Sequence, residues 1–356
     1  MNRNRKTKPI LTCLLMVAGA ILPTGGAANA EFKFGTPANL GTAINSIHDE
    51  AAPCISTDGL ELYFCDTPLD LYPGGQGGQD IWVAKRVSTD QPWSTAVNLG
   101  SPVNGASDDG VPRLSSDGLS LYFASNRRGG YGNFDIWVST RTSPSSPWGA
   151  PANIGSPVNT SADEAFFSIS VAGLELYFSE WQSIRPAGFG QTDIWVARRP
   201  SPGAPWGTPV NLGAEVNSGH KDEQPFISPD GLSLFFLSDR PGGYTTREGD
   251  IWVTTRRTVS ESWSTPVNLG PIVNNPDSGG STFPYISADD SVLYFTAYDR
   301  PGGYGGYDLW EVPIIYVPQC GDAKHPYPMG DLNQDCRVDY ADLALLCECW
   351  LQDNNP

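Results

Sequence analysis

Near the C-terminus, six residues carry oxygen atoms at a spacing that suits a metal ion. With Asp331 as the first position of a twelve-residue loop, the oxygen atoms fall at positions 1, 3, 5, 7, 9 and 12. They belong to Asp331, Asn333, Asp335, Arg337 through its main-chain carbonyl, Asp339 and Asp342. Oxygen ligands at this spacing are the donor set that wraps Ca²⁺. The sequence therefore predicts a calcium site here, with Ca²⁺ as the cofactor.

A second set of acidic residues recurs as adjacent pairs, and a Gly-rich stretch that carries an arginine recurs as a separate feature. The pairs are Asp49–Glu50, Asp108–Asp109, Asp163–Glu164 and Asp222–Glu223, and the arginines are Arg127, Arg185, Arg240 and Arg300. Carboxylates gathered around one opening could hold a cation or hydrogen-bond a sugar. Alternatively, each pair caps its own loop or bonds the neighbouring arginine. We favour the structural interpretation, and the eight acidic residues remain candidate ligand-binding positions.

Catalysis by these acids would be glycoside hydrolysis, which needs two carboxylates with different pKa values at a fixed separation. Repetition makes the pairs equivalent, and nothing in the sequence distinguishes one from another. His48 and His220 occupy matching places, but no nucleophile motif accompanies them. We therefore assign no catalytic residue and favour a binding protein, with an extracellular glycan-active hydrolase as the alternative.

The chain is built from five copies of one unit. Asp-Ile-Trp or Asp-Leu-Trp recurs at intervals of 55, 58, 57 and 58 residues, beginning at Asp80, Asp135, Asp193, Asp250 and Asp308. Asn-Leu-Gly or Asn-Ile-Gly recurs in the same register, and each of its glycines is followed four residues later by another asparagine. A fixed period of this length is the signature of a repeat architecture.

Each unit shows the pattern of four short strands. In the fourth copy these are residues 225–228, residues 232–237 and residues 250–255, followed by a strand that ends in Asn-Leu-Gly. An Asp-Gly dipeptide between the first two runs is typical of a hairpin turn. Four strands per unit and no helical period predict an all-β fold, a five-bladed β-propeller. The first Asn-Leu-Gly strand, at residues 37–41, is expected to complete the last blade and close the ring.

The repeated aromatic residues fit this architecture. Tryptophans stand before the fourth strand of most units, and Tyr/Phe pairs such as Tyr177–Phe178 and Phe235–Phe236 lie in the second strand. We expect them to pack blade against blade rather than to bind a ligand.

The unit resembles the WD-like propeller repeat of the TolB family, above all at SDRPGGY (Ser238 to Tyr244) and DRPGGYGGYDLW (Asp299 to Trp310). The resemblance covers residues 37–317. It implies a propeller that serves protein interaction or ligand binding, while fold alone does not assign function.

The C-terminal loop resembles one half of a dockerin, in which Asp at the twelfth position is usual. This resemblance implies attachment to another extracellular protein, with a cohesin-like partner. The segment departs from the pattern in three ways. Cys336 stands where glycine normally allows a sharp turn, only one loop is present, and Tyr340–Ala341 replace the Ser/Thr pair of many dockerins.

Residues 1–30 read as an export signal: four basic residues, an apolar stretch to about residue 22, and Ala-Asn-Ala before Glu31. The apolar run is too short for a spanning helix, so we expect no membrane insertion. Removing this leader takes the formal charge from −17 to −21. A chain this acidic is expected to repel nucleic acid.

Six cysteines follow the leader, at positions 54, 65, 320, 336, 347 and 349. In an exported protein an even count favours disulfides, but sequence does not choose among the pairings. Three histidines and no paired Cys/His spacing argue against structural zinc.

The sequence thus predicts four parts: a signal peptide (1–30), the propeller (31–317), a linker (318–329) and a dockerin-like module with one EF-hand-type calcium loop (330–356). We expect an exported protein, periplasmic or extracellular, whose partner is a protein or a polysaccharide.

Overall fold

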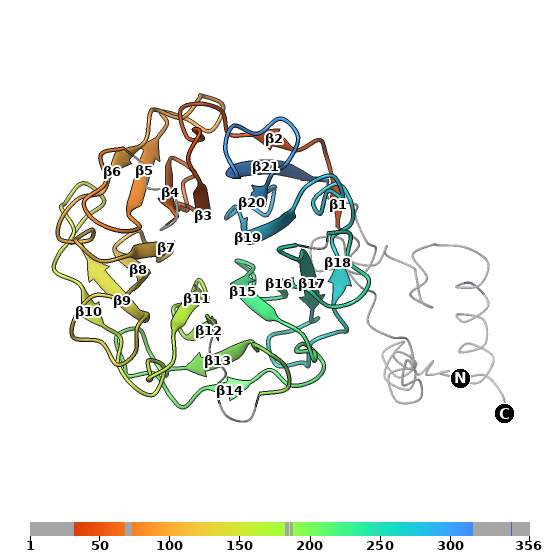
Figure 1. Cartoon of the computed structure of the whole chain (residues 1–356). Coiled ribbons are helices and arrows are strands. Elements are labelled where there is room, and N and C mark those ends of the chain that lie inside the picture. The colour runs from red at the N-terminus through yellow and green to blue at the C-terminus, as the bar shows by residue number, and fades with distance from the viewer. Residues whose placement is uncertain are drawn as a thin grey trace, which may run out of the picture. The chain divides into compact units, whose positions relative to one another are not determined.

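The computed structural model describes residues 32–67, 73–181, 185, 188–245 and 247–315, together with Leu343. The leader and the predicted calcium loop lie outside the described residues. Residues Phe32–Ile315 form one compact unit of five antiparallel sheets around a central axis (Figure 1). The predicted all-β, five-bladed propeller is confirmed. Among the described residues of the chain, no helix is long and apolar enough to cross a membrane.

The blades follow one another in chain order, each with its first strand nearest the axis (Figure 1). Blade 1 contains β3 (Glu50–Ile55), β4 (Glu61–Asp66), β5 (Ile81–Lys85) and β6 (Val97–Asn98). Blade 2 contains β7 (Asp109–Leu114), β8 (Ser120–Ser125), β9 (Asp135–Thr140) and β10 (Ala152–Asn153). Blade 3 contains β11 (Glu164–Ile169), β12 (Glu175–Glu180), β13 (Trp195–Arg198) and β14 (Val210–Asn211). Blade 4 contains β15 (Asp222–Ile227), β16 (Ser233–Ser238), β17 (Asp250–Thr255) and β18 (Val267–Asn268).

Blade 5 is completed by the N-terminal segment. It contains β19 (Gly280–Ile286), β20 (Val292–Tyr298) and β21 (Tyr307–Ile315). The outer edge of β21 pairs with β2 (Ala38–Asn39) and with β1 (Lys33–Phe34). The expected ring closure is confirmed, and β1 adds a second short strand that the sequence pattern did not predict. Both strands cover an edge that would otherwise be open to pairing with another chain.

A buried asparagine in each connection between blades explains the second sequence marker. The Asn274 amide accepts a hydrogen bond from the Ile251 N–H and donates to the Ile251 carbonyl, both at 2.9 Å. It also donates to the Asn268 side chain at 2.9 Å. The side chain thereby pairs with the main chain of the third strand as a neighbouring strand would. The same contacts recur at Asn45, Asn104, Asn159 and Asn217.

The first sequence marker is explained by the aspartate that opens each Asp-Ile-Trp triplet. The Asp250 carboxylate accepts a hydrogen bond from the Asn268 side chain at 2.7 Å and from the main-chain N–H of Tyr244 at 2.5 Å. The carboxylate therefore joins the outer strand of the blade to the loop between its second and third strands. Asp80, Asp193 and Asp308 hold their loops in the same way.

An arginine and a tryptophan fix the hairpin-turn end of blades 1 to 4. Arg256 lies over the Trp263 ring, 4.3 Å from its centroid, and its Nε donates to the carbonyl of Gly231 in the hairpin turn at 2.9 Å. A charged group over an aromatic face is stabilised by the ring quadrupole. The same arrangement joins Arg86 to Trp93, Arg141 to Trp148, and Arg199 to Trp206.

The expected hairpin turns and aromatic packing are confirmed. Gly231 has a φ of 72°, and Asp290 takes the same left-handed conformation with a φ of 59° in the copy that lacks glycine. The Tyr/Phe pairs of the second strands are buried between the blades. In the described residues Cys54 and Cys65 are free and buried, so the expectation of disulfides is wrong for these two. They lie on adjacent strands, but opposite Tyr63 and Ala51 rather than opposite each other.

The innermost strands differ from the prediction in length. The first strand of the fourth copy begins at Asp222, three residues before the predicted start at Pro225. The pairing with β16 shifts register between Glu223 and Phe226. Gln224 has a φ of 55° just before a proline that has no N–H to donate. This bulge hid the beginning of the strand from a pattern based on alternation.

We predict that Asn274→Ala lowers the free energy of unfolding by about 2–4 kcal/mol, because it leaves a buried N–H and a buried carbonyl without partners. Asn275→Ala is the matched control, since that side chain accepts one bond from the exposed Asp277 N–H. Its loss is expected to be below about 1 kcal/mol. Urea unfolding of both variants measures the difference, and equal losses would refute the role given to Asn274.

Candidate functional site

The loop face of the propeller is the end formed by the loops between second and third strands and by the connections between blades. Hydrogen bonds join the two kinds of loop. The N–H of Gln79, at the end of the first loop of blade 1, donates to Asp108 in the next connection at 3.0 Å. Phe134 donates to Asp163 at 3.1 Å, and Tyr307 donates to Asp49 at 2.9 Å. The predicted convergence of acidic and Gly-rich loops is thus present.

Four of the eight predicted ligand carboxylates lie at the start of the innermost strands: Glu50, Asp109, Glu164 and Asp222. All four are completely buried. Each accepts hydrogen bonds from the residue four positions earlier, which closes the connection into a turn. Glu50 accepts the Ser46 N–H at 3.1 Å and the Ser46 hydroxyl at 2.6 Å. Asp222 accepts the equivalent pair from Ser218 at 2.6 and 2.9 Å.

Three of these buried carboxylates also meet the arginine of the Gly-rich stretch. The Nη2 atoms of Arg127 and Arg240 lie 2.6 and 2.5 Å from Asp109 and Asp222. The Nη2 atom of Arg185 lies 3.0 Å from Glu164. Each guanidinium stands over a phenylalanine and a tryptophan ring of its own blade. In these blades acid and arginine are paired, as the structural interpretation expected.

Blade 5 replaces the acid with a hydroxyl. Ser281 occupies the place of Asp222 and donates to the Val273 carbonyl at 2.8 Å. Arg300 donates to the same carbonyl at 2.8 Å and to the Ile272 carbonyl at 2.7 Å. The arginine is therefore kept for its contacts with the connection, even where no carboxylate is present.

The pair in blade 4 is out of register with the others. Strand pairing places Asp222 opposite Ser238, as Asp109 lies opposite Ser125. Lys221 therefore occupies the position of Asp108, and Glu223 lies one residue further along the strand. Glu223 is buried and accepts a hydrogen bond from Thr192 at 2.9 Å. The first acid of the pair is therefore present in only three of these four blades, 1, 2 and 3.

Glu50 differs from the other three buried acids because its blade lacks the arginine of the Gly-rich stretch. The sequence of blade 1 has Pro68 at the corresponding position. Burial raises the pKa of Glu50 to about 8, although the bonds from Ser46 oppose this. Burial also raises the pKa of Glu164, to about 7, against the lowering effect of Thr160 and Arg185. Glu50 therefore keeps its proton at neutral pH, while Glu164 titrates close to neutral pH.

The axis of the propeller is crossed by side chains of the innermost strands. Arg113 of β7 is 3% exposed, and its guanidinium donates to the Phe167 carbonyl of blade 3 at 3.1 Å and the Pro53 carbonyl of blade 1 at 3.2 Å. Nearer the loop face, the rings of Phe166 and Phe283 lie 5.6 Å apart between blades 3 and 5. Among the described residues, no group of three or more acidic, cysteine or histidine side chains is placed to hold a metal ion.

The aromatic crown is a set of four side chains, one on the loop of each of blades 2 to 5. Its members are Tyr131, Phe189, Tyr244 and Tyr304, which are 45–57% exposed. Each main-chain N–H is held by the aspartate of the following Asp-Ile-Trp or Asp-Leu-Trp triplet, at 2.5–2.8 Å. Blade 1 has Gln76 at this position. The loops are anchored from below while their aromatic rings face solvent.

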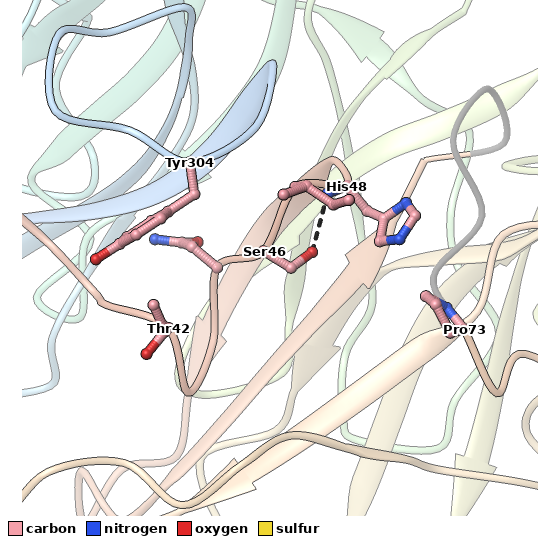
Figure 2. Close-up of a pocket in the computed structure, with 7 residues that line it drawn as sticks. Thr42, Ser46, His48, Pro73 and Tyr304 are labelled. Atoms are coloured by element: carbon pink, nitrogen blue, oxygen red, sulfur yellow. Dashed lines mark hydrogen bonds between the residues drawn. The ribbon is translucent and has the colours of Figure 1, made fainter.

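One crown residue borders a shallow pocket of about 420 Å³ where the last blade meets the first (Figure 2). Tyr304 forms one wall, and the connection that bears Thr42, Ser46 and His48 forms the floor. Pro73, from the loop of blade 1, lies beyond His48. Among the described residues, none that lines this pocket carries a carboxylate. A narrow gap bordered by Glu180 and Asp193, among others, has no room for a water molecule.

No protein-family model matches the chain, and no curated protein matches it. Among solved structures, a thermostable family-43 glycoside hydrolase is 14% identical, with a TM-score of 0.53 over 78% of this chain and 92% of that one. An alpha-L-arabinofuranosidase from Lactobacillus brevis is 17% identical, with a TM-score of 0.52 over 77% of this chain and 92% of that one. TolB from Acinetobacter baumannii is 13% identical, with a TM-score of 0.44 over 74% of this chain and 54% of that one.

The similarity to the two hydrolases shows the propeller fold alone, because each is less than 25% identical to this chain, and it leaves the activity open.

The aromatic crown is the feature that sequence reasoning missed. The signal was present, because an aromatic residue occupies the same loop position in four of the five copies and lies outside every strand. Aromatic residues also recur in the strands, where they are buried, so repetition alone does not indicate that an aromatic residue is exposed.

We predict that Glu50→Gln makes stability less dependent on pH. The folded pKa of about 8 exceeds the ordinary value of 4.5. The stabilising effect of the protonated acid is therefore complete below about pH 4.5 and is lost as pH rises through 8. The variant should match the wild type at pH 5 and melt about 3–6 °C higher at pH 8.5, as thermal unfolding at both values would measure.

Asp222→Asn is the control for this experiment. It removes a carboxylate from the same strand position but leaves Arg240 without a counter-charge, so its melting temperature should fall at both pH values. A Glu50→Gln variant that melts below the wild type at pH 8.5 would contradict the account of Glu50.

Proposed function

We propose that this chain is an exported binding protein that holds an extracellular polysaccharide or protein on the aromatic crown of its loop face. One observation carries the proposal. The crown exposes four aromatic rings to solvent, while the buried carboxylates beneath them bond to their own connections and arginines. The groups offered to a ligand are therefore aromatic, and the groups suited to acid–base chemistry are engaged within the fold.

The crown is suited to binding because its loops are fixed before any ligand arrives. Each aromatic residue sits above a carboxylate–amide bond, and the glycine that follows Tyr131 and Tyr304 lies against the next connection. A Cβ on Gly305 would come within 2.4 Å of the His48 carbonyl. A loop held in this way loses little conformational freedom when it binds, which favours affinity. Tyrosine also provides a large contact area with few rotatable bonds.

A glycoside hydrolase is the second candidate. The observation that favours it is the raised pKa of two buried acids, Glu50 and Glu164, since a general acid must keep its proton near neutral pH. Against it, both acids are completely buried and bonded to their own connections. Neither of them lines the pocket beside Tyr304.

The two ends of the chain complete the proposal. The basic and apolar residues 1–30 support export, to the periplasm or beyond. The spacing of oxygen ligands from Asp331 to Asp342 supports a dockerin-like calcium module that tethers the propeller to another protein. Cys320, Cys336, Cys347 and Cys349 would then be placed to brace so short a module.

We predict that replacing the crown by alanine at Tyr131, Phe189, Tyr244 and Tyr304 abolishes ligand binding in a screen of polysaccharides and extracellular proteins. The control replaces three exposed valines of the outer strands, Val97, Val210 and Val267, by alanine. That variant should bind within about twofold of the wild type. Release of reducing sugar is measured in parallel, and cleavage that is lost with Glu50→Gln would favour the hydrolase instead.

We predict that calcium binds the full chain through the C-terminal loop. Calcium titration calorimetry of the wild type should show one site, and Asp331→Ala should remove it because a first-position ligand is lost. Asp299→Ala, an exposed aspartate of the propeller, serves as the control and should titrate like the wild type. A calcium site that survives Asp331→Ala would contradict the loop assignment.

A further inference from the structure

The pocket beside Tyr304 combines three loops from the first and last blades. Tyr304 lies between β20 and β21, while Thr42, Ser46, Ile47 and His48 lie between β2 and β3. Figure 2 shows the Tyr304 ring and Thr42 on one side of the pocket and Pro73 on the other, with Ser46 and His48 between them. The pocket exists because N-terminal residues complete the last blade before the chain enters the first.

The lining of this pocket has an apolar part and a polar part. Tyr304 and Ile47 are 49% and 79% exposed, and together with Pro73 they offer apolar surface. Thr42 contributes an exposed hydroxyl, and His48 contributes an imidazole. A ligand that fits such a lining has one apolar face and a polar edge. A pyranose ring has this character, because its C–H groups form a face and its hydroxyls project from the rim.

The charge of the pocket selects among ligands of this kind. In the part of the chain that the structure describes, the lining contains no carboxylate, lysine or arginine, and the whole chain carries a formal charge of −17. An anionic sugar would meet no cationic side chain among these residues and would be repelled by the acidic surface. A neutral sugar avoids both costs.

The arrangement of the crown also favours a sugar over a protein at this place. Protein interfaces depend on clustered anchors in a contiguous patch. The crown rings stand on separate blades, and at Tyr304 the second apolar wall is Ile47. The equivalent residues in the next connections are Ala106, Ser161 and Gly219. A volume of about 420 Å³ falls in the range of small-molecule sites.

The Tyr304 wall and the floor of the pocket are fixed by the fold. The Tyr304 N–H donates to Asp308 at 2.8 Å. On the floor, the hydroxyl of Ser46 donates to the buried Glu50 and accepts the His48 N–H at 2.9 Å. A preformed site loses little entropy when a small ligand binds.

We propose, on the basis of the proposed binding function, that this pocket binds a neutral pyranose unit of a polysaccharide, with Tyr304 as the stacking residue. Thr42 and His48 lie where the ring hydroxyls would be, so they contribute polar contacts to the same unit.

The test uses the full chain and neutral β-1,4-linked hexasaccharides of glucose, xylose and mannose, with a hexagalacturonate as the anionic comparison. Affinity is measured by titration calorimetry. Tyr304→Ala should weaken binding of the preferred neutral hexasaccharide at least tenfold, and Tyr304→Phe should restore it to within about twofold because the ring remains. Melting temperatures show that the variants are folded.

Val267→Ala, at an exposed valine of β18 outside the crown, is the control, and its effect should be below threefold. Tyr131→Ala is the comparison within the crown, because Tyr131 has the same loop position and the same anchoring to an aspartate. Its loss of affinity should be smaller than that of Tyr304→Ala. Equal losses in Tyr304→Ala and Tyr131→Ala would overturn the pocket and leave the crown as the binding surface. Unchanged sugar affinity in both variants would overturn the pocket and the crown together. If the chain bound only hexagalacturonate, or no saccharide, the proposal that the pocket binds a neutral pyranose would be overturned. The proposed function would then stand only if a protein bound through the crown.

Discussion

The buried asparagine of each connection is the contact on which the rest of the propeller depends. The outer strands are two residues long, too short to hold a blade together by their own ladder. By pairing with both main-chain groups of one residue in the third strand, the asparagine extends that ladder beyond the strand. Because Asn274 also bonds Asn268, it fixes the end of the outer strand as well. The asparagine therefore also fixes the start of the connection that leads to the innermost strand of the next blade.

Charged residues recur in this chain chiefly because the fold uses an arginine at both ends of blades 2, 3 and 4. One arginine ties the hairpin turn to the tryptophan before the outer strand, as Arg256 does with Gly231 and Trp263. Another, such as Arg240, lies between two rings at the opposite end and reaches the start of the innermost strand. Repetition of a residue type therefore identifies a structural part. What varies from blade to blade, such as Ile47 or Gln76, is the better guide to a specific ligand.

Much of the architecture could be predicted from the sequence. Two markers in constant register determined the number of blades, and the leading Asn-Leu-Gly strand predicted ring closure, because both follow from local hydrogen bonding. The bulge at Gln224 could not be predicted, since it depends on a left-handed residue that is not glycine. For the same reason, the pairing register that separates Glu223 from the other acids became visible only with strand partners in place.

The candidate site was harder to predict, because burial is a property of the assembled ring. Glu50 and Asp49 are adjacent in the chain, yet one is completely buried and the other is partly exposed. No pattern of charge distinguishes them. The aromatic crown is local in sequence, but its exposure follows from loops that are held from below, which a count of aromatic residues does not reveal.

The closure of blade 5 also determines how the propeller carries mechanical load. Lys33 lies opposite Ile315, so the polypeptide enters and leaves the ring at the same blade, side by side. Tension applied between these two ends would pull β1 away from β21 and break the hydrogen bonds of this antiparallel pair one after another, while the other four blades bear none of it. A chain pulled through its C-terminal segment would thus be opened, if at all, at this single seam, and the pocket beside Tyr304 lies on that seam.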